Sequence, residues 1–475
     1  MTRVLSVASE CAPLVKTGGL ADVVGALPAA LKAHGDDVKT LLPGYPAVMG
    51  ELKSSREVVA FKKFFGGQGR VVAAKIAGLE LLLLDAPHLF DRPGGPYIGS
   101  NGHDWPDNPE RFAALCYAAA HIAKNGAGKW KPQVVHGHDW QAGFVPEYLN
   151  ELDAGDVPFV FTIHNIAFHG NTGADRLASL GLSDWRFNAD HFEFWGQISA
   201  LKAGLMGANR ITTVSKTYAE ELMTPEFGMG MDGVLRARRG DLTGIVNGID
   251  TEAWDPATDQ AIKTYKTAKG KGPNKTALRK EFGLSKSDGP LCVLISRLTH
   301  QKGIDLVLQA LPALLSRGGQ LALLGSGDTA LEVALLERAA AEPNVAVKIG
   351  YDEALSHRMI AGGDAILVPS RFEPCGLTQL YGLRYGTIPL VALTGGLADT
   401  VINASPAALS QGVATGIQFR PISAESLSNA FNRLCDLYAD RATWATLQKN
   451  AMKQQVGWDN SAAEYSALYA EFVKG

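Results

Sequence analysis

The chain has 475 residues, enough for two or three domains of ordinary size. Its 45 lysines and arginines nearly balance its 48 aspartates and glutamates, which argues against binding of nucleic acid or anionic membranes by bulk charge. Hydrophobic residues make up 46% of the chain, a content that is typical of globular proteins and excludes general disorder.

The beginning of the chain combines a basic residue with several apolar ones, as signal peptides do. Glu10 and Pro13 interrupt this stretch and no small-residue cleavage site follows, so we expect a first strand and a loop instead. No apolar run approaches the roughly 18 residues that a membrane helix needs. The 5 cysteines are far apart and form no C-x-x-C pair, which predicts free thiols in a reducing cytoplasm.

Short apolar runs alternate with helical periods along most of the chain. Strands are expected at residues 4–8, 38–42, 71–76, 79–84, 133–136, 159–163, 210–214, 291–295, 320–324, 345–349, 365–368 and 388–392. Most of these runs are apolar throughout, as strands of buried parallel sheets must be. The pair around Ala77 and Gly78 predicts a hairpin, and segment 424–438 has the apolar spacing of a helix. The alternation predicts doubly wound parallel sheets.

One sequence occurs twice. T-G-G-L-A-D-V-V, starting at Thr17, returns as T-G-G-L-A-D-T-V, starting at Thr394, and each copy is expected to open a helix after a strand. The two copies reflect common ancestry of two domains, a shared use of glycine turns toward one ligand, or both. A domain break is expected near residues 247–250, because segments 254–256 and 267–275 lack apolar periodicity. Ser461 and Glu464 have the spacing of a capping box for a last helix that ends near Phe472.

Two common nucleotide-binding motifs are missing. The glycine loop at residues 325–328 lacks the third glycine of G-x-G-x-x-G, and no segment fits the phosphate loop G-x-x-x-x-G-K-[ST]. An ordinary NAD enzyme and a phosphate-loop NTPase are therefore disfavoured. Glycine loops that open helices still suit a diphosphate, because the first helical N–H groups have no partner within the helix.

Polar residues follow several predicted strands, where open α/β sheets bind ligands. Arg297 and Lys302 suit a diphosphate leaving group. His136, His138 and His164 lack further metal ligands at characteristic spacing, so a metal site is disfavoured and His136 is expected in the core. Glu373 precedes a glycine turn, either as a carboxylate favoured by the helix dipole or as a ligand group. No histidine at a fixed spacing marks Cys375 as a nucleophile.

Six segments occur in a specific order: K-T-G-G-L at 16–20, H-D-W-Q at 138–141, T-I-H-N at 162–165, S-R-L at 296–298, Q-K-G at 301–303 and E-P-C-G-L-T at 373–378. Together they closely resemble the bacterial glycogen synthases and plant starch synthases that use ADP-glucose, over nearly the whole chain.

The resemblance implies a GT-B fold, with two Rossmann-like, doubly wound α/β domains that face each other across a deep cleft. Residues 1–245 would form the acceptor side, with the helix at 459–475 packing back on it, and residues 246–458 the donor side. The implied reaction transfers glucose from ADP-glucose to the non-reducing end of an α-1,4-glucan with retention of configuration. It implies a cytoplasmic enzyme without metal, cofactor, nucleic acid or membrane partner; the oligomeric state stays open.

The resemblance also assigns residues. Arg297 and Lys302 would stabilise the departing phosphate, Glu373 would accept hydrogen bonds from glucose hydroxyls, and His164 would lie against the transferred sugar. Tyr97 would build the acceptor side, with Trp140 and Trp195 as weaker candidates. The implied donor-binding residues are Lys16, Gly18, Gly19, Asp22, Asp139, Asn165, Asn247, Gly350, Tyr351 (stacked on adenine), Cys375, Gly376, Leu377 and Thr378.

One position departs from related retaining transferases, which often carry a second glutamate eight positions after the first. Here that position is Tyr381, so ribose recognition must use other groups. Retention without an obvious nucleophile favours front-face attack, in which the departing phosphate takes the acceptor proton. The alternatives are a GT-B transferase with another donor or acceptor, such as a sucrose-type or trehalose-type synthase, an inactive glucan- or nucleotide-binding protein, and a metabolite dehydrogenase.

Overall fold

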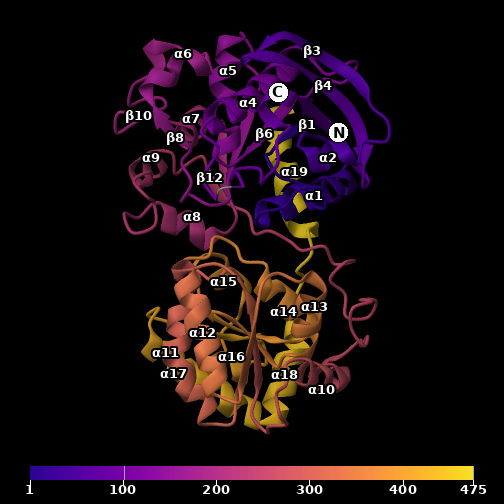
Figure 1. Cartoon of the computed structure of the whole chain (residues 1–475), viewed down its shortest axis with the longest axis vertical. Coiled ribbons are helices and arrows are strands. Elements are labelled where there is room, and N and C mark those ends of the chain that lie inside the picture. Colours follow the sequence, from indigo (N-terminus) through magenta and orange to yellow (C-terminus); the bar gives the residue numbers. More distant parts are fainter. Residues whose placement is uncertain (101, 474–475) are drawn as a thin grey trace. The chain divides into compact units, whose positions relative to one another are not determined.

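The computed structural model describes residues 1–100 and 102–473, and the chain divides into two α/β units (Figure 1). The first unit comprises Met1–Asn247 and the segment that begins at Trp458, and the second comprises Gly248–Gly457. The chain therefore passes between the units at residues 247–248 and again at 457–458.

The first unit contains a nine-stranded sheet in the order β12-β11-β7-β6-β1-β2-β5-β4-β3. Its strands are β1 (Arg3–Val7), β2 (Asp37–Pro43), β3 (Arg56–Phe64), β4 (Gly67–Ile76), β5 (Leu79–Asp85), β6 (Val134–His138), β7 (Phe159–Ile163), β11 (Arg210–Thr213) and β12 (Leu242–Gly244). Pairing is parallel from β12 to β5, and β4 pairs antiparallel with β5 and β3. The predicted hairpin is confirmed: Ala77 (φ 50°) and Gly78 (φ 82°) have the positive φ values of a tight two-residue turn.

A smaller sheet of the first unit has the order β8-β10-β9, formed by β8 (Asn171–Gly173), β9 (Glu193–Phe194) and β10 (Gln197–Ser199). The helices of the unit are α1 (Gly19–Ala33), α2 (Pro46–Gly50), α3 (Pro87–Phe90), α4 (Asn108–Asn125), α5 (Val145–Glu151), α6 (Leu177–Leu180), α7 (Ala200–Gly207), α8 (Lys216–Leu222), α9 (Asp232–Ala237) and α19 (Asp459–Val473). Helices α1 and α19 lie side by side on the large sheet, where Val23, Leu27 and Tyr465 pack with Val4 and Val160 (Figure 1).

The predicted capping box of the last helix is wrong. Helix α19 begins at Asp459, so Ser461 lies inside its first turn, and the Ser461 hydroxyl donates to the carbonyl of Val246. The helix starts earlier because Trp458 is buried in the core of the first unit and its carbonyl accepts the N–H of Ala462 at 2.7 Å. Burial of the aromatic ring thus fixes the first turn, and Ser461 contacts a neighbouring segment.

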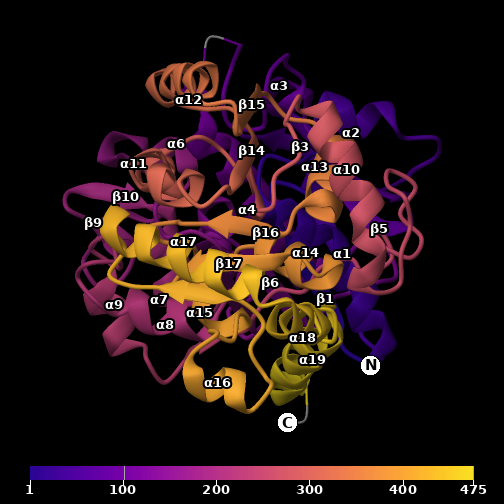
Figure 2. The ribbon, with the colours of Figure 1, turned by 90° about the horizontal axis from the view of Figure 1, so that it is seen from below.

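The second unit contains a fully parallel sheet in the order β15-β14-β13-β16-β17-β18. Its strands are β13 (Leu291–Ile295), β14 (Gln320–Gly325), β15 (Val345–Ile349), β16 (Ala365–Val368), β17 (Ile388–Ala392) and β18 (Ile417–Phe419). Its helices are α10 (Gly272–Glu281), α11 (Ile304–Leu315), α12 (Thr329–Ala341), α13 (Glu353–Gly362), α14 (Thr378–Tyr385), α15 (Gly395–Thr400), α16 (Pro406–Ser410), α17 (Ala424–Ala439) and α18 (Arg441–Ala451). Helices α11 and α17 cover one face of the sheet, and α13 and α14 the other (Figure 2). The doubly wound parallel sheet is as predicted.

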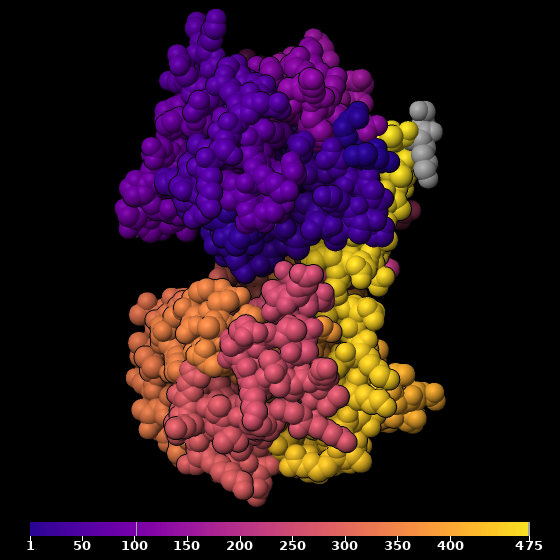
Figure 3. Space-filling view, turned by 90° about the vertical axis from the view of Figure 1, so that its right-hand side faces the viewer, coloured from indigo at the N-terminus to yellow at the C-terminus, as the bar shows by residue number. Residues whose placement is uncertain are grey.

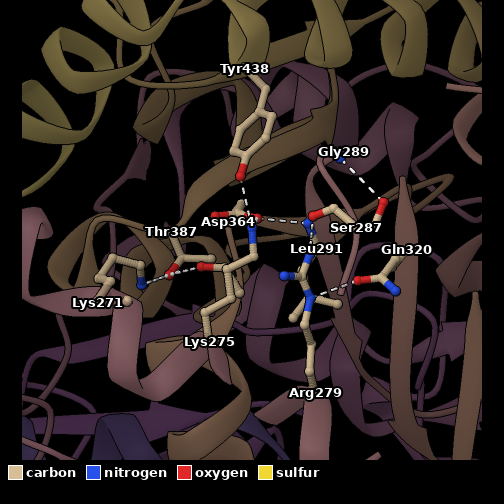
Figure 4. Close-up of polar contacts among 12 residues, drawn as sticks. Lys271, Lys275, Arg279, Ser287, Gly289, Leu291, Gln320, Asp364, Thr387 and Tyr438 are labelled. Atoms are coloured by element: carbon tan, nitrogen blue, oxygen red, sulfur yellow. Dashed lines mark hydrogen bonds and ion pairs between the residues drawn. The ribbon is translucent and has the colours of Figure 1, made fainter. Parts of the chain in front are cut away.

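The segment that leads from the first crossing point into α10 lies over the surface of the second unit (Figure 3). Although residues 267–275 lack apolar periodicity, they form a short 3₁₀ turn and the start of α10. A buried polar network explains this. The side-chain nitrogen of Lys271 donates to the Thr387 hydroxyl at 2.7 Å and the Ala361 carbonyl at 2.8 Å, and Lys275 pairs with Asp364 at 2.6 Å (Figure 4). Specific hydrogen bonds thus replace the missing apolar stripe.

Candidate functional site

In the second unit, a lysine and a glutamate that lie 71 positions apart in the sequence form an ion pair. Lys302 ends a short 3₁₀ turn between β13 and α11, and its Nζ lies 2.6 Å from Oε2 of Glu373, which follows β16. The same carboxylate oxygen accepts the hydroxyl of Ser370 at 2.7 Å. Glu373 is therefore not a solvated helix-start carboxylate: it is buried and held by two donors.

Arg297 has the opposite environment. It lies in the turn after β13, its side chain is exposed, and it forms no ion pair within the described part of the chain. The turn thus presents an available guanidinium beside a strand end, while the second predicted cation, Lys302, is already engaged.

The loop from Glu373 to Leu377 leads into α14, whose first turn has no side-chain cap. Gly376 adopts φ +71°, and a Cβ there would lie 2.5 Å from Oε1 of Gln379. The buried Gln379 amide donates to the carbonyls of Cys375 (3.0 Å) and Gly376 (2.8 Å), which keeps those carbonyls turned inward. The first N–H groups of an uncapped helix suit an anion, so the end of this loop can receive a phosphate or sugar oxygen.

The second copy of the repeated sequence packs against the loop from Glu373 to Leu377. Gly395 and Gly396 are buried at the start of α15, where the N–H of Gly396 donates to the Glu373 carbonyl at 3.1 Å. A Cβ on Gly395, at φ +43°, would lie 2.0 Å from that carbonyl oxygen. In this copy the glycines permit close backbone packing, and contact of residues 394–396 with a ligand stays a prediction.

Two further predicted positions lie on the second unit. Gly350 follows β15 and donates its N–H to the Gly325 carbonyl at 3.0 Å, and Tyr351 is 74% exposed with its hydroxyl bonded to Glu353. Tyr381, which occupies the position of the missing second glutamate, stacks on Trp254 with ring centroids 3.8 Å apart. The Tyr381 side chain therefore has a packing role, and it offers no carboxylate to a ribose.

In the first unit, the glycine loop before α1 is open. Gly18 and Gly19 are exposed, a Cβ at either would meet nothing within 4 Å, and α1 has no side-chain cap. Lys16 Nζ lies 2.8 Å from Asp22 Oδ1, so these two predicted residues come together. Unlike the second copy, this copy leaves its two glycines exposed.

Glu10 holds this loop in place. Its buried carboxylate accepts the N–H and the hydroxyl of Thr17, and the N–H of Gly18 at 3.2 Å. The Tyr97 hydroxyl also bonds Glu10, at 2.5 Å, and Ser9 at 2.7 Å. Tyr97, predicted to build the acceptor side, thus supports the glycine loop through its hydroxyl. Burial and the neighbouring Glu10 carboxylate raise the pKa of Tyr97 well above its usual value.

The ends of β6 and β7 bring together Asp139, His164 and Asn165. Asp139 has a positive φ of 55° and accepts the N–H groups of His164 (2.7 Å) and Asn165 (3.3 Å) on one oxygen. Enclosure raises the pKa of Asp139 to about 7, although the two backbone donors favour the charged form. Asn247 is also buried, and its Oδ1 has no hydrogen-bond partner in the described part of the chain. A buried acceptor without a protein donor is left for water or a ligand.

The predicted core role of His136 is confirmed. Its Nε2 bonds the Thr162 hydroxyl at 2.6 Å and its Nδ1 bonds the Tyr469 hydroxyl at 2.7 Å. Within residues 1–100 and 102–473, no three His, Cys, Asp or Glu side chains are grouped as ligands of a metal ion would be. Of the two tryptophans proposed for glucan stacking, Trp140 packs edge-on against Phe112 at 5.1 Å, and Trp195 is 86% exposed.

Three residues with clear structural roles in these sites were missed: Glu10, Ser370 and Gln379. Each acts by long-range or loop-internal hydrogen bonds to a motif residue, and none has a characteristic spacing. The one available signal was position, since Glu10 and Ser370 both come shortly after predicted strands.

No helix within the described residues is long and apolar enough to span a bilayer. The family model described as the starch synthase catalytic domain matches residues 3–237, and the model of group 1 glycosyl transferases matches residues 275–453. The chain is 72% identical over 472 residues to a glycogen synthase of Jannaschia sp. (strain CCS1), with 99% of both chains covered. It is 61% identical over 469 residues to a glycogen synthase of Paracoccus denitrificans, with 99% of both covered.

Solved structures give the same picture. The catalytic domain of starch synthase IV from Arabidopsis thaliana, bound to ADP and acarbose, matches with a TM-score of 0.88 and 33% identity over 100% of both chains. A sucrose-phosphate synthase from Thermosynechococcus elongatus matches with a TM-score of 0.61 at 20% identity over 100% of both chains, and this likeness shows the fold alone.

Proposed function

Because the chain belongs to the family of bacterial glycogen synthases and starch synthases, we propose that it transfers glucose from ADP-glucose to the non-reducing end of an α-1,4-glucan with retention of configuration. The observation that carries this proposal is the pairing of Lys302 with Glu373 beside the uncapped start of α14 and the exposed Arg297. Cations and helix amides suit a diphosphate, and a buried carboxylate suits sugar hydroxyls.

In the second unit, Arg297 and Lys302 would bind the diphosphate and Glu373 the glucose hydroxyls. The backbone of Cys375, Gly376, Leu377 and Thr378 would meet the phosphate and the sugar. Gly350 would lie beside the adenine and Tyr351 would stack on it; the 74% exposure of Tyr351 supports this role. The ADP in the related starch synthase IV structure supports an adenine nucleotide.

In the first unit, Lys16, Gly18, Gly19 and Asp22 would contact the diphosphate. The open glycine loop and the Lys16–Asp22 pair support this assignment. His164, Asp139, Asn165 and Asn247 would face the transferred sugar, and the unpartnered Oδ1 of Asn247 supports a ligand hydroxyl there. Tyr97 would fix the acceptor side through its bond to Glu10.

The reaction would proceed by front-face attack. The bond between glucose C1 and the β-phosphate oxygen breaks, and its electron pair stays on the departing ADP. The acceptor O4 forms the new bond to C1 on the same face, and its proton passes to the departing phosphate oxygen. Arg297 and Lys302 stabilise the charge that develops on that oxygen. The step needs no added cofactor, and the buried free cysteines support a cytoplasmic enzyme.

The decisive experiment offers glycogen together with radiolabelled ADP-glucose or UDP-glucose and measures incorporation into the polymer. We expect faster incorporation from ADP-glucose and an α-configured product by proton NMR. Incorporation from UDP-glucose alone, or a β-configured product, would contradict the proposal. Isolation of a covalent glucosyl-enzyme would refute front-face attack while leaving the donor assignment intact.

A further inference from the structure

Three buried side chains of the first unit form a linear chain of hydrogen bonds that ends at His164. Ser6 lies on β1, His138 ends β6, and His164 directly follows β7, and these strands are adjacent in the sheet. Ser6 Oγ lies 3.2 Å from His138 Nε2, and His138 Nδ1 lies 3.0 Å from His164 Nε2. At most 9% of any of the three residues is exposed.

Burial favours the neutral form of both imidazole rings. Burial lowers the pKa of His164 to about 3, and burial with the neighbouring rings of His136 and His164 lowers the pKa of His138 well below its usual value. A neutral imidazole carries one N–H and one acceptor nitrogen. One proton therefore lies between His138 Nδ1 and His164 Nε2. Which of the two nitrogens carries it depends on the hydrogen bond between His138 and Ser6.

Ser6 determines that position. Within the described part of the chain, its hydroxyl has no acceptor other than His138 Nε2. If Nε2 of His138 carried the proton instead, the buried Ser6 proton would have no acceptor. The arrangement that satisfies every group runs from Ser6 O–H to His138 Nε2, and from His138 Nδ1–H to His164 Nε2. The proton of His164 is then on Nδ1.

The surroundings do not compete for these atoms. His136 lies beside His138, with ring centroids 4.1 Å apart, but its two nitrogens are bonded to Thr162 and Tyr469. His164 Nδ1 has no hydrogen-bond partner within residues 1–100 and 102–473, and it is not sealed from solvent. It is thus the available end of the chain.

We propose that Ser6 and His138 are positioning residues that hold His164 as its Nδ1–H tautomer, so that the ring offers a hydrogen-bond donor to a hydroxyl oxygen of the transferred sugar. The sugar contact rests on the proposed function, whereas the tautomer rests on the hydrogen-bond chain and the burial of its rings. A fixed donor needs no reorganisation when the sugar arrives, which is how preorganised groups contribute to a rate.

The test is a direct observation of the tautomers in the full-length protein labelled with ¹⁵N-histidine. Long-range proton–nitrogen correlation spectra distinguish Nδ1–H from Nε2–H rings, and a His164→Asn variant assigns the signal of His164 by its loss. We expect the Nδ1–H pattern for His164 in the unliganded wild type. An Nε2–H pattern would overturn the proposal. This is the pattern expected if a buried water accepts the Ser6 proton.

Three variants separate positioning from packing. Ser6→Ala should convert His164 to a mixture of tautomers and lower kcat by about tenfold, with KM for the donor changed by less than about twofold. Ser6→Thr keeps the hydroxyl and adds one methyl group at the small cavity that Ser6 lines with Val24 and Leu27, so tautomer and kcat should stay those of wild type. Val4→Ala removes buried volume from the same face of β1 and should lower Tm without moving either readout.

An unchanged tautomer and unchanged kcat in Ser6→Ala would refute the positioning role. If Ser6→Ala does not fold, the wild-type and Ser6→Thr spectra still decide the tautomer. Failure of the proposed function has a different signature, because a wild type that transfers no glucose would still show the Nδ1–H pattern.

Discussion

Replacing Lys302 by methionine is expected to destabilise the second unit as well as to suppress transfer. Methionine keeps most of the stem but removes the ammonium that lies 2.6 Å from Glu373 Oε2. The carboxylate would then keep one neutral donor, the Ser370 hydroxyl at 2.7 Å. Because only 9% of the Glu373 side chain is exposed, water cannot replace the lost partner.

The expected loss of stability follows from this burial. Breaking a buried ion pair by removing one partner costs about 3–5 kcal/mol, and we expect about 3 kcal/mol because 18% of the Lys302 side chain remains in solvent. For a unit of about 200 residues this lowers Tm by roughly 6–12 °C. The measurement is thermal unfolding followed by calorimetry. Adding Glu373→Gln to Lys302→Met removes the unpaired charge and should restore most of the loss, but not the activity.

Arg297→Met is the matched control. The Arg297 side chain is exposed and has no ion pair in the part of the chain that the structure describes, so its loss should change stability by less than about 0.5 kcal/mol. Both single variants should lower kcat by about 10²–10³, since in the proposed reaction each would remove a cation from the departing phosphate. A Lys302→Met enzyme as stable as wild type, or a double variant no more stable than Lys302→Met, would show that the buried pair does not stabilise the unit.

Three further predictions test other parts of the chain. Gly395→Ala should destabilise the second unit by about 2–4 kcal/mol, because its Cβ would meet the Glu373 carbonyl at 2.0 Å, whereas Gly18→Ala in the open copy should keep Tm and raise KM for the donor. Burial lowers the pKa of Lys271 to about 7, so between pH 7 and 9 the unfolded chain binds a proton that the folded chain lacks. The free energy of unfolding should therefore rise by up to about 1.4 kcal/mol per pH unit. Denaturant titrations at several pH values should show a weaker rise with pH for Lys271→Met. Burial raises the thiol pKa of Cys11 to about 12 and that of Cys292 well above its usual value, so Ellman's reagent should react slowly with the native protein and quickly with the 5 free cysteines of the unfolded chain.

Strands of both large sheets were predictable because a parallel strand buried on both faces needs an uninterrupted apolar run. β7 and β13 are examples, and their predicted bounds match the structure. β3 was missed because it lies at the sheet edge, where exposed charged residues such as Arg56 and Lys62 break the apolar pattern. β18 was missed because it has only 3 residues, too few for any periodicity.

The predictable part of the site consists of residues at strand ends, and the missed part consists of residues that hold them. Parallel strands deliver Asp139 and His164 to one sheet edge, so their proximity follows from topology. The contact of Glu10 with Tyr97 spans 87 positions, and no local pattern encodes it. The same reason explains the failed capping box, since Ser461 bonds a carbonyl 215 positions away.

The repeated sequence shows how far identical residues can diverge in role. In both copies a glycine pair opens a helix, so the local conformation follows from the sequence. What differs is the neighbour: Gly18 and Gly19 face open space, whereas Gly395 and Gly396 lie against the backbone of Glu373 and Cys375. Glycine permits both, because it lacks the Cβ that would meet a protein carbonyl in the second copy. The second copy therefore fixes the loop that carries Glu373, and exchange of Gly395 or Gly396 should alter that loop.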